Sequence, residues 1–219
     1  MIHFAALDQL RPYAEFYGTL LDQSEVDRLN RFRFDADRER FLLGHGALRS
    51  VLGSRVGVEP RDLSFDRGRF GKPVLTDHPL PFNLSDTKDA IAIAVGEDQV
   101  LGVDVETVAR AVDHVSVGEH YFTKEEQAAI ASAPDGKRRF LEFWTRKEAV
   151  LKASGVGIMD DLKVLRVDQA VNRMTILHHA FIDMAEPEYH VGTWHIGSDH
   201  IVSLATPGPC AVTFRRIAH

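Results

Sequence analysis

The chain of 219 residues has very little cysteine and no long apolar run. Its single cysteine, Cys210, excludes an internal disulfide framework and a cysteine-rich zinc site, and it suits a reducing compartment. No apolar stretch approaches the roughly 20 residues that a membrane-spanning helix needs, and charged residues already occur within the first 15 positions. We therefore expect a cytoplasmic protein that does not enter a membrane.

The acidic balance of charge and the absence of several known motifs exclude further functions. The net charge is −6 at pH 7, so no global positive charge attracts anionic polymers, and neither a nucleic acid nor a membrane is expected as a partner. The sequence contains no His-Glu-x-x-His zinc motif, no Walker-type phosphate loop and no Gly-x-Ser-x-Gly elbow. An anionic ligand therefore has to be bound by local basic groups.

The composition is that of a globular protein, with 44% hydrophobic and 26% charged residues and no long linker. Helical spacing of apolar residues predicts helices over about residues 37–52 and 137–154. Alternating apolar residues predict strands at 90–95 and 100–105, joined as a hairpin through a turn at 96–98. Three more strand-like stretches lie near residues 162–167, 189–196 and 201–205. Each half thus shows helices followed by strands, which predicts the α+β class.

Two acidic side chains in the segment 102–106 are the first candidates for chemistry. Asp104 and Glu106 lie two residues apart on a strand-like stretch, so both side chains point to the same face. Carboxylates at a strand end can bind a hard divalent cation, and magnesium is usually held by one or two of them together with substrate phosphates and water. An acidic strand end that simply faces solvent has the same spacing, so spacing alone leaves both interpretations open.

A second candidate segment lies on the long predicted helix. Trp144, Glu148 and Lys152 follow one another at intervals of four residues, which places a tryptophan, an acid and a cation along one face of that helix. These three side chains would line one wall of a site. The alternative is an ordinary helix pair between Glu148 and Lys152, worth roughly 0.2–0.5 kcal/mol.

Together the two segments, residues 102–106 and 144–152, resemble the two signature motifs of the Sfp-type 4'-phosphopantetheinyl transferases in order and separation. The Phe-Asn-Leu-Ser at residues 82–85 is similar to the family's loop that touches the coenzyme A diphosphate. The Gly-Lys-Pro at residues 71–73 stands where the family has the same tripeptide. The resemblance covers roughly residues 24–158.

This resemblance implies a magnesium-dependent enzyme that transfers the 4'-phosphopantetheine arm of coenzyme A to a serine of an apo acyl or peptidyl carrier protein, releasing 3',5'-ADP. It also implies the family fold, two similar α+β halves related by a pseudo-twofold axis, with coenzyme A and the metal in the cleft between them. The N-terminal half would be residues 1–100, and the C-terminal half, with the metal-binding motifs, residues 101–219. Because the family usually builds its site within one chain, we expect a monomer.

The resemblance further implies a role for each acid and base of the two motifs. Asp104, Glu106 and Glu148 would hold Mg²⁺, which offsets the charge that builds on the leaving 3',5'-ADP. Lys152 would lie against the same phosphates, and Glu148 and Lys152 would both act in catalysis. Ser85 would contact the diphosphate of coenzyme A.

Three basic residues match family positions near the other end of coenzyme A, and a fourth is a further candidate. Arg28, Arg67 and Lys72 correspond to positions that grip the 3'-phosphate and the adenine, and Arg40 on the first predicted helix is a further candidate. Guanidinium groups suit phosphate because their fork of N–H donors matches its oxygens. Taken singly, each arginine also fits a solvated surface charge.

Glu126 has two interpretations. It aligns with the acid proposed in some family members to deprotonate the carrier serine, directly or through water. It also stands three residues after Thr123, a spacing that is typical of a capping box, in which the glutamate accepts a hydrogen bond from a backbone N–H at the helix start. The sequence leaves both interpretations open.

One position departs from the family pattern. Where the family usually has Ser-His-Ser, residues 85–87 are Ser-Asp-Thr, so a histidine that would hydrogen-bond a phosphate is replaced by a carboxylate that would repel it. Asp86 would then reach the metal, turn towards a base such as Lys88, or weaken coenzyme A binding. On the repulsion argument, Asp86→His should lower the KM for coenzyme A.

The sequence is also compatible with two rival functions. One is a binding module for coenzyme A and a carrier protein with weakened or lost turnover, as the Asp86 substitution suggests. The other is a magnesium-dependent phosphohydrolase acting on another diphosphate, which would release its product without any carrier protein. Retention of all three predicted metal ligands argues against the binding module.

Overall fold

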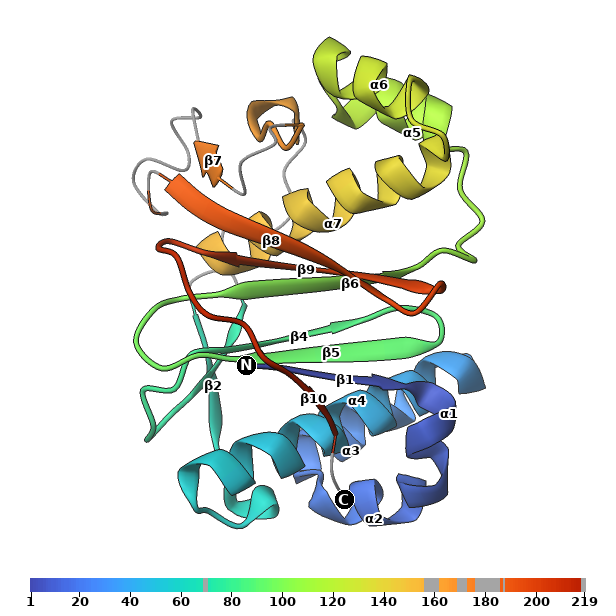
Figure 1. Cartoon of the computed structure of the whole chain (residues 1–219). Helices are drawn as coiled ribbons and strands as arrows, with labels where there is room; N and C mark the ends of the chain where they lie inside the picture. The colour runs from blue at the N-terminus through green and yellow to red at the C-terminus, as the bar shows by residue number, and fades with distance from the viewer. Residues whose placement is uncertain (69–70, 156–161, 169–172, 176–185, 187, 218–219) are drawn as a thin grey trace.

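The computed structural model consists of two β-sheets packed against each other, with helices on both outer sides (Figure 1). It describes residues 1–68, 71–155, 162–168, 173–175, 186 and 188–217. Helices and strands are mixed as in an α+β protein, and the predicted fold class is confirmed. No helix within these described ranges is both long and apolar enough to cross a membrane.

The first sheet combines strands from both ends of the chain. Its strands, in spatial order, are β10 (Phe214–Arg216), β1 (Ile2–Ala6), β5 (Ala90–Val95) and β4 (Phe82–Asp86). Neighbours run antiparallel except for β10 and β1, which run parallel. The helices on this side are α1 (Leu7–Leu10), α2 (Ala14–Leu20), α3 (Gln23–Asn30) and α4 (Asp35–Val56). The final strand thus returns to the sheet that contains the N-terminus.

The second sheet is antiparallel throughout and belongs to the later part of the chain. Its strands, in spatial order, are β6 (Gly102–Thr107), β9 (His200–Thr206), β8 (Glu188–Ile196) and β7 (Arg173–Thr175). The helices on this side are α5 (His114–Tyr121), α6 (Lys124–Ala131) and α7 (Gly136–Ser154). Apart from both sheets, a short hairpin pairs β2 (Phe65–Arg67) with β3 (Pro73–Leu75). Single turns of 3-10 helix occur at Arg11–Tyr13, Pro60–Asp62 and Leu162–Val164.

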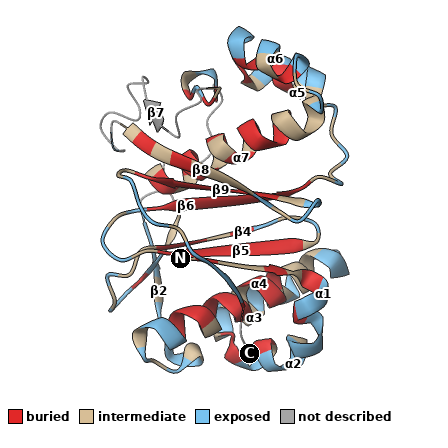
Figure 2. Ribbon diagram, in the orientation of Figure 1, coloured by how far each residue is buried: buried red, intermediate tan, exposed pale blue. Residues whose placement is uncertain are grey.

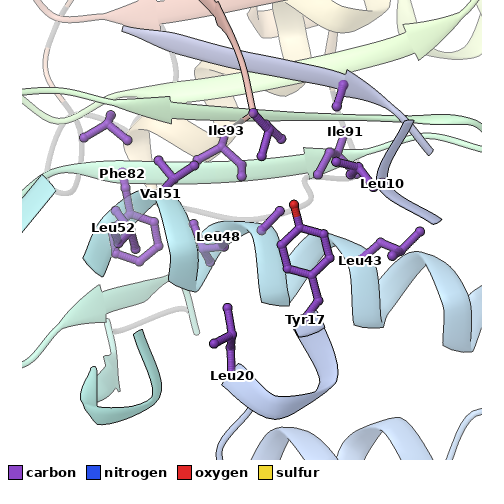
Figure 3. Close-up of a cluster of buried hydrophobic side chains, with 14 of the residues drawn as sticks. Leu10, Tyr17, Leu20, Leu43, Leu48, Val51, Leu52, Phe82, Ile91 and Ile93 are labelled. Carbon is purple, nitrogen blue, oxygen red and sulfur yellow. The ribbon is translucent and has the colours of Figure 1, made fainter. Parts of the chain in front are cut away.

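Helix α4 covers the first sheet with an apolar side that is buried along most of its length (Figure 2). Leu43, Leu48 and Leu52 belong to one buried cluster with Ile91 and Ile93 of β5 (Figure 3). Full burial of each such side chain stabilises the fold by about 1.5–3 kcal/mol. The helix is longer at both ends than the predicted 37–52; at its C-terminal end Val56 still packs against this cluster, and the helix ends at Gly57, whose φ is +72°.

The structure corrects two of the strand predictions. Residues 90–95 form β5, and 100–105 overlaps β6, but the two strands do not make a hairpin: both edges of β5 are paired, with β1 and β4, and β6 pairs with β9. The stretch 162–167 contains a 3-10 turn instead of a strand, because its carbonyl groups turn inward to a buried lysine. The predicted helix at 137–154 and the strands at 189–196 and 201–205 are confirmed.

Candidate active site

Strand β6 and helix α7 lie in direct backbone contact, and this contact brings the two predicted motifs together. A Cβ on Gly102 would stand 2.1 Å from the carbonyl oxygen of Ala149 and 2.3 Å from the backbone nitrogen of Ala153. No side chain fits at such distances, so the close approach requires glycine. As a result, the carboxylates of β6 lie beside the polar side chains of α7.

Asp104 is the centre of this site and is only 5% exposed. Its Oδ1 accepts hydrogen bonds from the Ser85 hydroxyl at 2.8 Å and from the Lys152 ammonium group at 2.6 Å. Lys152 also donates to the Ser85 hydroxyl, at 2.8 Å. The second oxygen, Oδ2, is buried and has no hydrogen-bond partner among the described residues. Since an unsatisfied buried polar atom costs roughly 1–3 kcal/mol, and more when charged, Oδ2 marks a position suited to a ligand.

Glu106 lies on the same face of β6 and is held from two sides. Arg110 donates to its Oε1, and the Thr87 hydroxyl donates to its Oε2 at 3.1 Å. Burial and the neighbouring charge of Asp104 raise the pKa of Glu106, while Arg110 and Thr87 act in the opposite direction. The carboxylate is therefore oriented by hydrogen bonds but remains electrostatically costly.

Glu148 reaches the same site from α7. Burial and then the charge of Asp104 raise its pKa, and Lys152 lowers it. Carboxylates that disfavour one another's ionised forms gain stability when a cation joins them. As they stand, the described residues include no group of three Asp, Glu, His or Cys side chains placed to hold a metal ion, and Lys152 and Arg110 are bound to two of the acids. The arrangement is thus an acidic cluster balanced by two basic side chains.

A cavity of about 570 Å³ lies between α3, α4, the β2–β3 hairpin and β4. Arg28, Arg67 and Asp86 are among its lining residues. The Arg28 guanidinium carbon is 4.9 Å from the centroid of the Phe41 ring, and His45 stacks on that ring with centroids 3.9 Å apart. Guanidinium groups beside an aromatic surface can bind phosphate together with a planar ring.

Comparison with known proteins matches both parts of the chain to one family. Residues 100–205 match the family model described as the 4'-phosphopantetheinyl transferase superfamily, and residues 11–98 match the model for the N-terminal part of a 4'-phosphopantetheinyl transferase. HetI, a 4'-phosphopantetheinyl transferase of Nostoc sp., is 38% identical over 158 residues, which cover 69% of this chain and 67% of HetI. The chain belongs to the 4'-phosphopantetheinyl transferase superfamily.

Other relatives agree with this membership. A putative 4'-phosphopantetheinyl transferase of Synechocystis sp. is 30% identical over 164 residues, 73% of this chain and 67% of the relative. Sfp of Bacillus subtilis is 24% identical over 147 residues, 66% of this chain and 64% of Sfp. The predicted Sfp-type resemblance is therefore confirmed, and so is the enzyme class. The chain is a transferase that acts on coenzyme A and carrier proteins, and its mixed α+β structure is consistent with the two-half fold of the family.

The negative charge of Asp86, which stands where the family usually has a histidine, is offset by a neighbouring arginine. The carboxylate forms an ion pair with Arg40, 2.6 Å between Oδ2 and Nε, and Arg40 also contacts Asp37 at 2.7 Å. Asp86 therefore turns towards a base, which is one of the three alternatives that the sequence left open, but that base is Arg40 and not Lys88. With its charge offset in this way, Asp86 repels a phosphate less than the sequence suggests.

Lys72 lies elsewhere than at the cavity with Arg28 and Arg67. Its ammonium group donates to the carbonyl oxygens of Leu101 and Lys152, each at 2.7 Å. Burial lowers the pKa of Lys72 to about 8. This residue therefore ties the start of β6 to the end of α7, and its predicted contact with coenzyme A has no support in the geometry.

Glu126 is fully buried, with an exposed fraction of 0%. Its Oε2 accepts hydrogen bonds from the Thr123 backbone N–H at 2.9 Å and from Lys147 at 3.0 Å, and Oε1 accepts one from the Val167 N–H at 2.8 Å. The capping box is thus present, and both oxygens are satisfied. The geometry favours the structural interpretation of Glu126 over that of a base.

The sequence reasoning missed two residues that contact the carboxylate cluster, Thr87 and Arg110. Thr87 follows Ser85 by two positions on one strand edge, so the period of a strand could have placed both hydroxyls on the same face. Arg110 gave only the weaker signal of a base four residues after an acid, in a segment that is not helical.

Proposed function

We propose that Asp104, Glu106 and Glu148 hold the divalent cation with which this transferase moves phosphopantetheine from coenzyme A to a carrier-protein serine. The observation that carries the proposal is the unpartnered, buried Oδ2 of Asp104 in a cluster of three acids. A cation would satisfy this oxygen and offset the burial and the mutual repulsion that raise the pKa of the other two carboxyl groups. Mg²⁺ fits best, because it prefers carboxylate oxygens completed by substrate phosphates and water.

The residues of this chain have distinct parts in the reaction. When bound, Mg²⁺ would supply charge neutralisation at the diphosphate. Lys152, fixed by Asp104 and Ser85, presents a cation to the same phosphates and stabilises the negative charge of the leaving 3',5'-ADP. The serine oxygen bonds to the pantetheine-linked phosphorus as the bond to 3',5'-ADP breaks. Of the two acids predicted to act in catalysis, Glu148 is the better proton acceptor, because both oxygens of Glu126 are occupied and buried.

The cavity beside β4 is proposed to receive the adenine end of coenzyme A. Arg28 and Arg67 are on its lining and would bind phosphate oxygens through their N–H forks. The stacked rings of Phe41 and His45 offer a flat surface on the same cavity wall. We propose no such contact for Lys72, whose ammonium group is already bound by two carbonyl oxygens.

Intact-mass analysis of an apo carrier protein, incubated with the transferase, coenzyme A and Mg²⁺, tests this assignment. The carrier should gain one phosphopantetheine, and Asp104→Ala and Glu148→Ala should abolish the gain. Glu142→Ala is the matched control, because Glu142 is a buried acid on the same helix that pairs with Arg139 and His195 instead. We expect this variant to keep the activity.

The same experiment separates the rival functions. Bound coenzyme A without modification of any of several carrier proteins would contradict turnover and favour the binding module. Release of product in the absence of a carrier protein would favour the phosphohydrolase. Full activity of Asp104→Ala would contradict the proposed metal site, although it would leave the transferase activity itself established.

A further inference from the structure

A base outside the predicted set, Arg110, is bound to the carboxylate cluster. It lies just beyond the end of β6 and donates from Nη1 to Oε1 of Glu106. Its backbone N–H donates to the Thr107 carbonyl oxygen at 3.0 Å, which fixes the turn that carries it. Its guanidinium carbon lies over Trp144 of α7, 5.5 Å from the ring centroid. Backbone, ion pair and ring together direct the Arg110 side chain at the predicted metal site.

Before any phosphate is bound, the charges of this site do not balance both bases and a divalent cation. Three carboxylates face two bases, so the addition of two positive charges would turn a small negative excess into a positive one. Lys152 is bound to both Asp104 and Ser85. Arg110 holds one oxygen of one acid, and its side chain is 36% exposed. Arg110 is therefore the base that can withdraw with the loss of fewer hydrogen bonds.

We propose that Arg110 is a positioning residue that takes the place of the divalent cation at Glu106 and leaves this carboxylate when the cation binds. The proposal rests on the proposed function, because it treats Glu106 as a cation ligand. While paired, Arg110 and Thr87 hold the two oxygens of Glu106 and keep the carboxylate aimed at the site. After the exchange, the cation makes the same electrostatic contact, and the guanidinium group remains at the exposed edge.

The first test is the affinity for Mg²⁺, measured by calorimetry without coenzyme A or carrier protein. Arg110→Gln should bind Mg²⁺ about threefold to tenfold more tightly than the parent chain, because a competing positive charge is removed from a partly exposed site. Arg110→Lys keeps the charge and should bind Mg²⁺ with nearly the parent affinity. If Arg110 only supported the Glu106 side chain, Arg110→Gln would bind Mg²⁺ more weakly than the parent chain, because one of the metal ligands would be less firmly held.

A matched control exists on α7. Arg139 pairs with Glu142 at 2.7 Å and lies over Phe143, 5.8 Å from its ring centroid. The side chains of this pair are 41% and 11% exposed, against 36% and 11% for Arg110 and Glu106. Arg139→Gln therefore removes a similar pair outside the site and should leave Mg²⁺ affinity unchanged.

Tryptophan emission reports the movement itself. The chain contains two tryptophans, so a Trp194→Phe background leaves Trp144, the ring that Arg110 covers, as the sole emitter. Mg²⁺ should change the emission of Trp144 in this background. The change should be absent when Arg110→Gln is added, although calorimetry still detects the metal.

Two results would overturn the inference while leaving the transferase assignment intact. One is weaker Mg²⁺ binding by Arg110→Gln, and the other is an unchanged Mg²⁺ affinity together with a Trp144 emission that does not respond to the metal. A failure of the proposed metal site is recognised differently. The parent chain would then show no Mg²⁺ binding, and the Asp104→Ala and Glu148→Ala variants would still modify the carrier protein.

Discussion

Replacing Glu126 with glutamine removes the charge, but little of the volume, from a completely buried ion pair. The side chains of Glu126 and Lys147 are both 0% exposed, and Oε2 and Nζ are 3.0 Å apart. Loss of one partner from a buried pair costs about 3–5 kcal/mol, because the remaining buried charge loses the counterion that it touches directly. The carbonyl oxygens of Leu162 and Leu165 still accept from Lys147, at 2.7 and 2.6 Å. We therefore expect Glu126→Gln to lower the free energy of unfolding by about 3 kcal/mol.

Urea unfolding followed by circular dichroism measures this loss, and carrier-protein labelling at a temperature where all variants are folded measures activity. The double variant Glu126→Gln/Lys147→Met removes both charges and should recover most of the stability. If Glu126 only caps its helix, the double variant also keeps its transferase activity within a few-fold. A stable double variant that has lost activity by about 100-fold would show that Glu126 takes the serine proton. A loss below about 1 kcal/mol in the single variant would refute the buried-pair reasoning.

Three further outcomes are expected. Gly102→Ala should destabilise the fold by about 1–3 kcal/mol or more and lower kcat, because the new Cβ would stand 2.1 Å from a backbone oxygen of α7. Thermal unfolding measures the loss, and Gly44→Ala is the control, because its new Cβ would have no atom nearer than 3.8 Å. Burial lowers the pKa of Lys72 from 10.5 to about 8, so between these pH values the unfolded chain carries a proton on Lys72 that the folded chain has lost. The free energy of unfolding should therefore rise with pH across this window, and Lys72→Met should flatten the rise. Asp86→His should change the KM for coenzyme A by less than about fivefold in steady-state assays, because Arg40 already offsets this partly exposed carboxylate; a larger decrease would restore the repulsion argument.

The sequence could predict which acidic and basic side chains of the two motifs share a face, because the residue spacing within a strand or a helix determines this. A period of two residues puts Asp104 and Glu106 on one strand face, and a spacing of four puts Glu148 and Lys152 on one helix face. The resemblance to a family then joins the two segments. The structure adds the reason for their approach, which is the absence of a side chain at Gly102.

Other features depend on contacts between residues far apart in the sequence, which no local pattern of residues reveals. The alternation at residues 90–95 predicts a strand, but its pairing with β1 at the start of the chain, about 85 residues away, does not follow from that pattern. Lys72 carries the charge expected of a phosphate ligand, yet two inward-facing carbonyl groups bind its ammonium group. For Glu126 the local capping signal was correct, and its buried partner Lys147 lies 21 residues away in sequence.

Strand β4 connects the stability of the two-sheet structure with the geometry of the candidate site. The side chain of Asn83 accepts a hydrogen bond from the Val103 N–H at 2.8 Å, and the Ser85 hydroxyl accepts one from the Val105 N–H at 3.3 Å. These two amides lie on the edge of β6 that is not paired with β9, and without such acceptors they would be unsatisfied in the interior. Ser85, together with Thr87, also donates to the two carboxylates of β6. A substitution that loosens this contact should therefore weaken the joint between the sheets and the metal site together, whereas Arg110→Gln changes the charge of the site and leaves the joint in place.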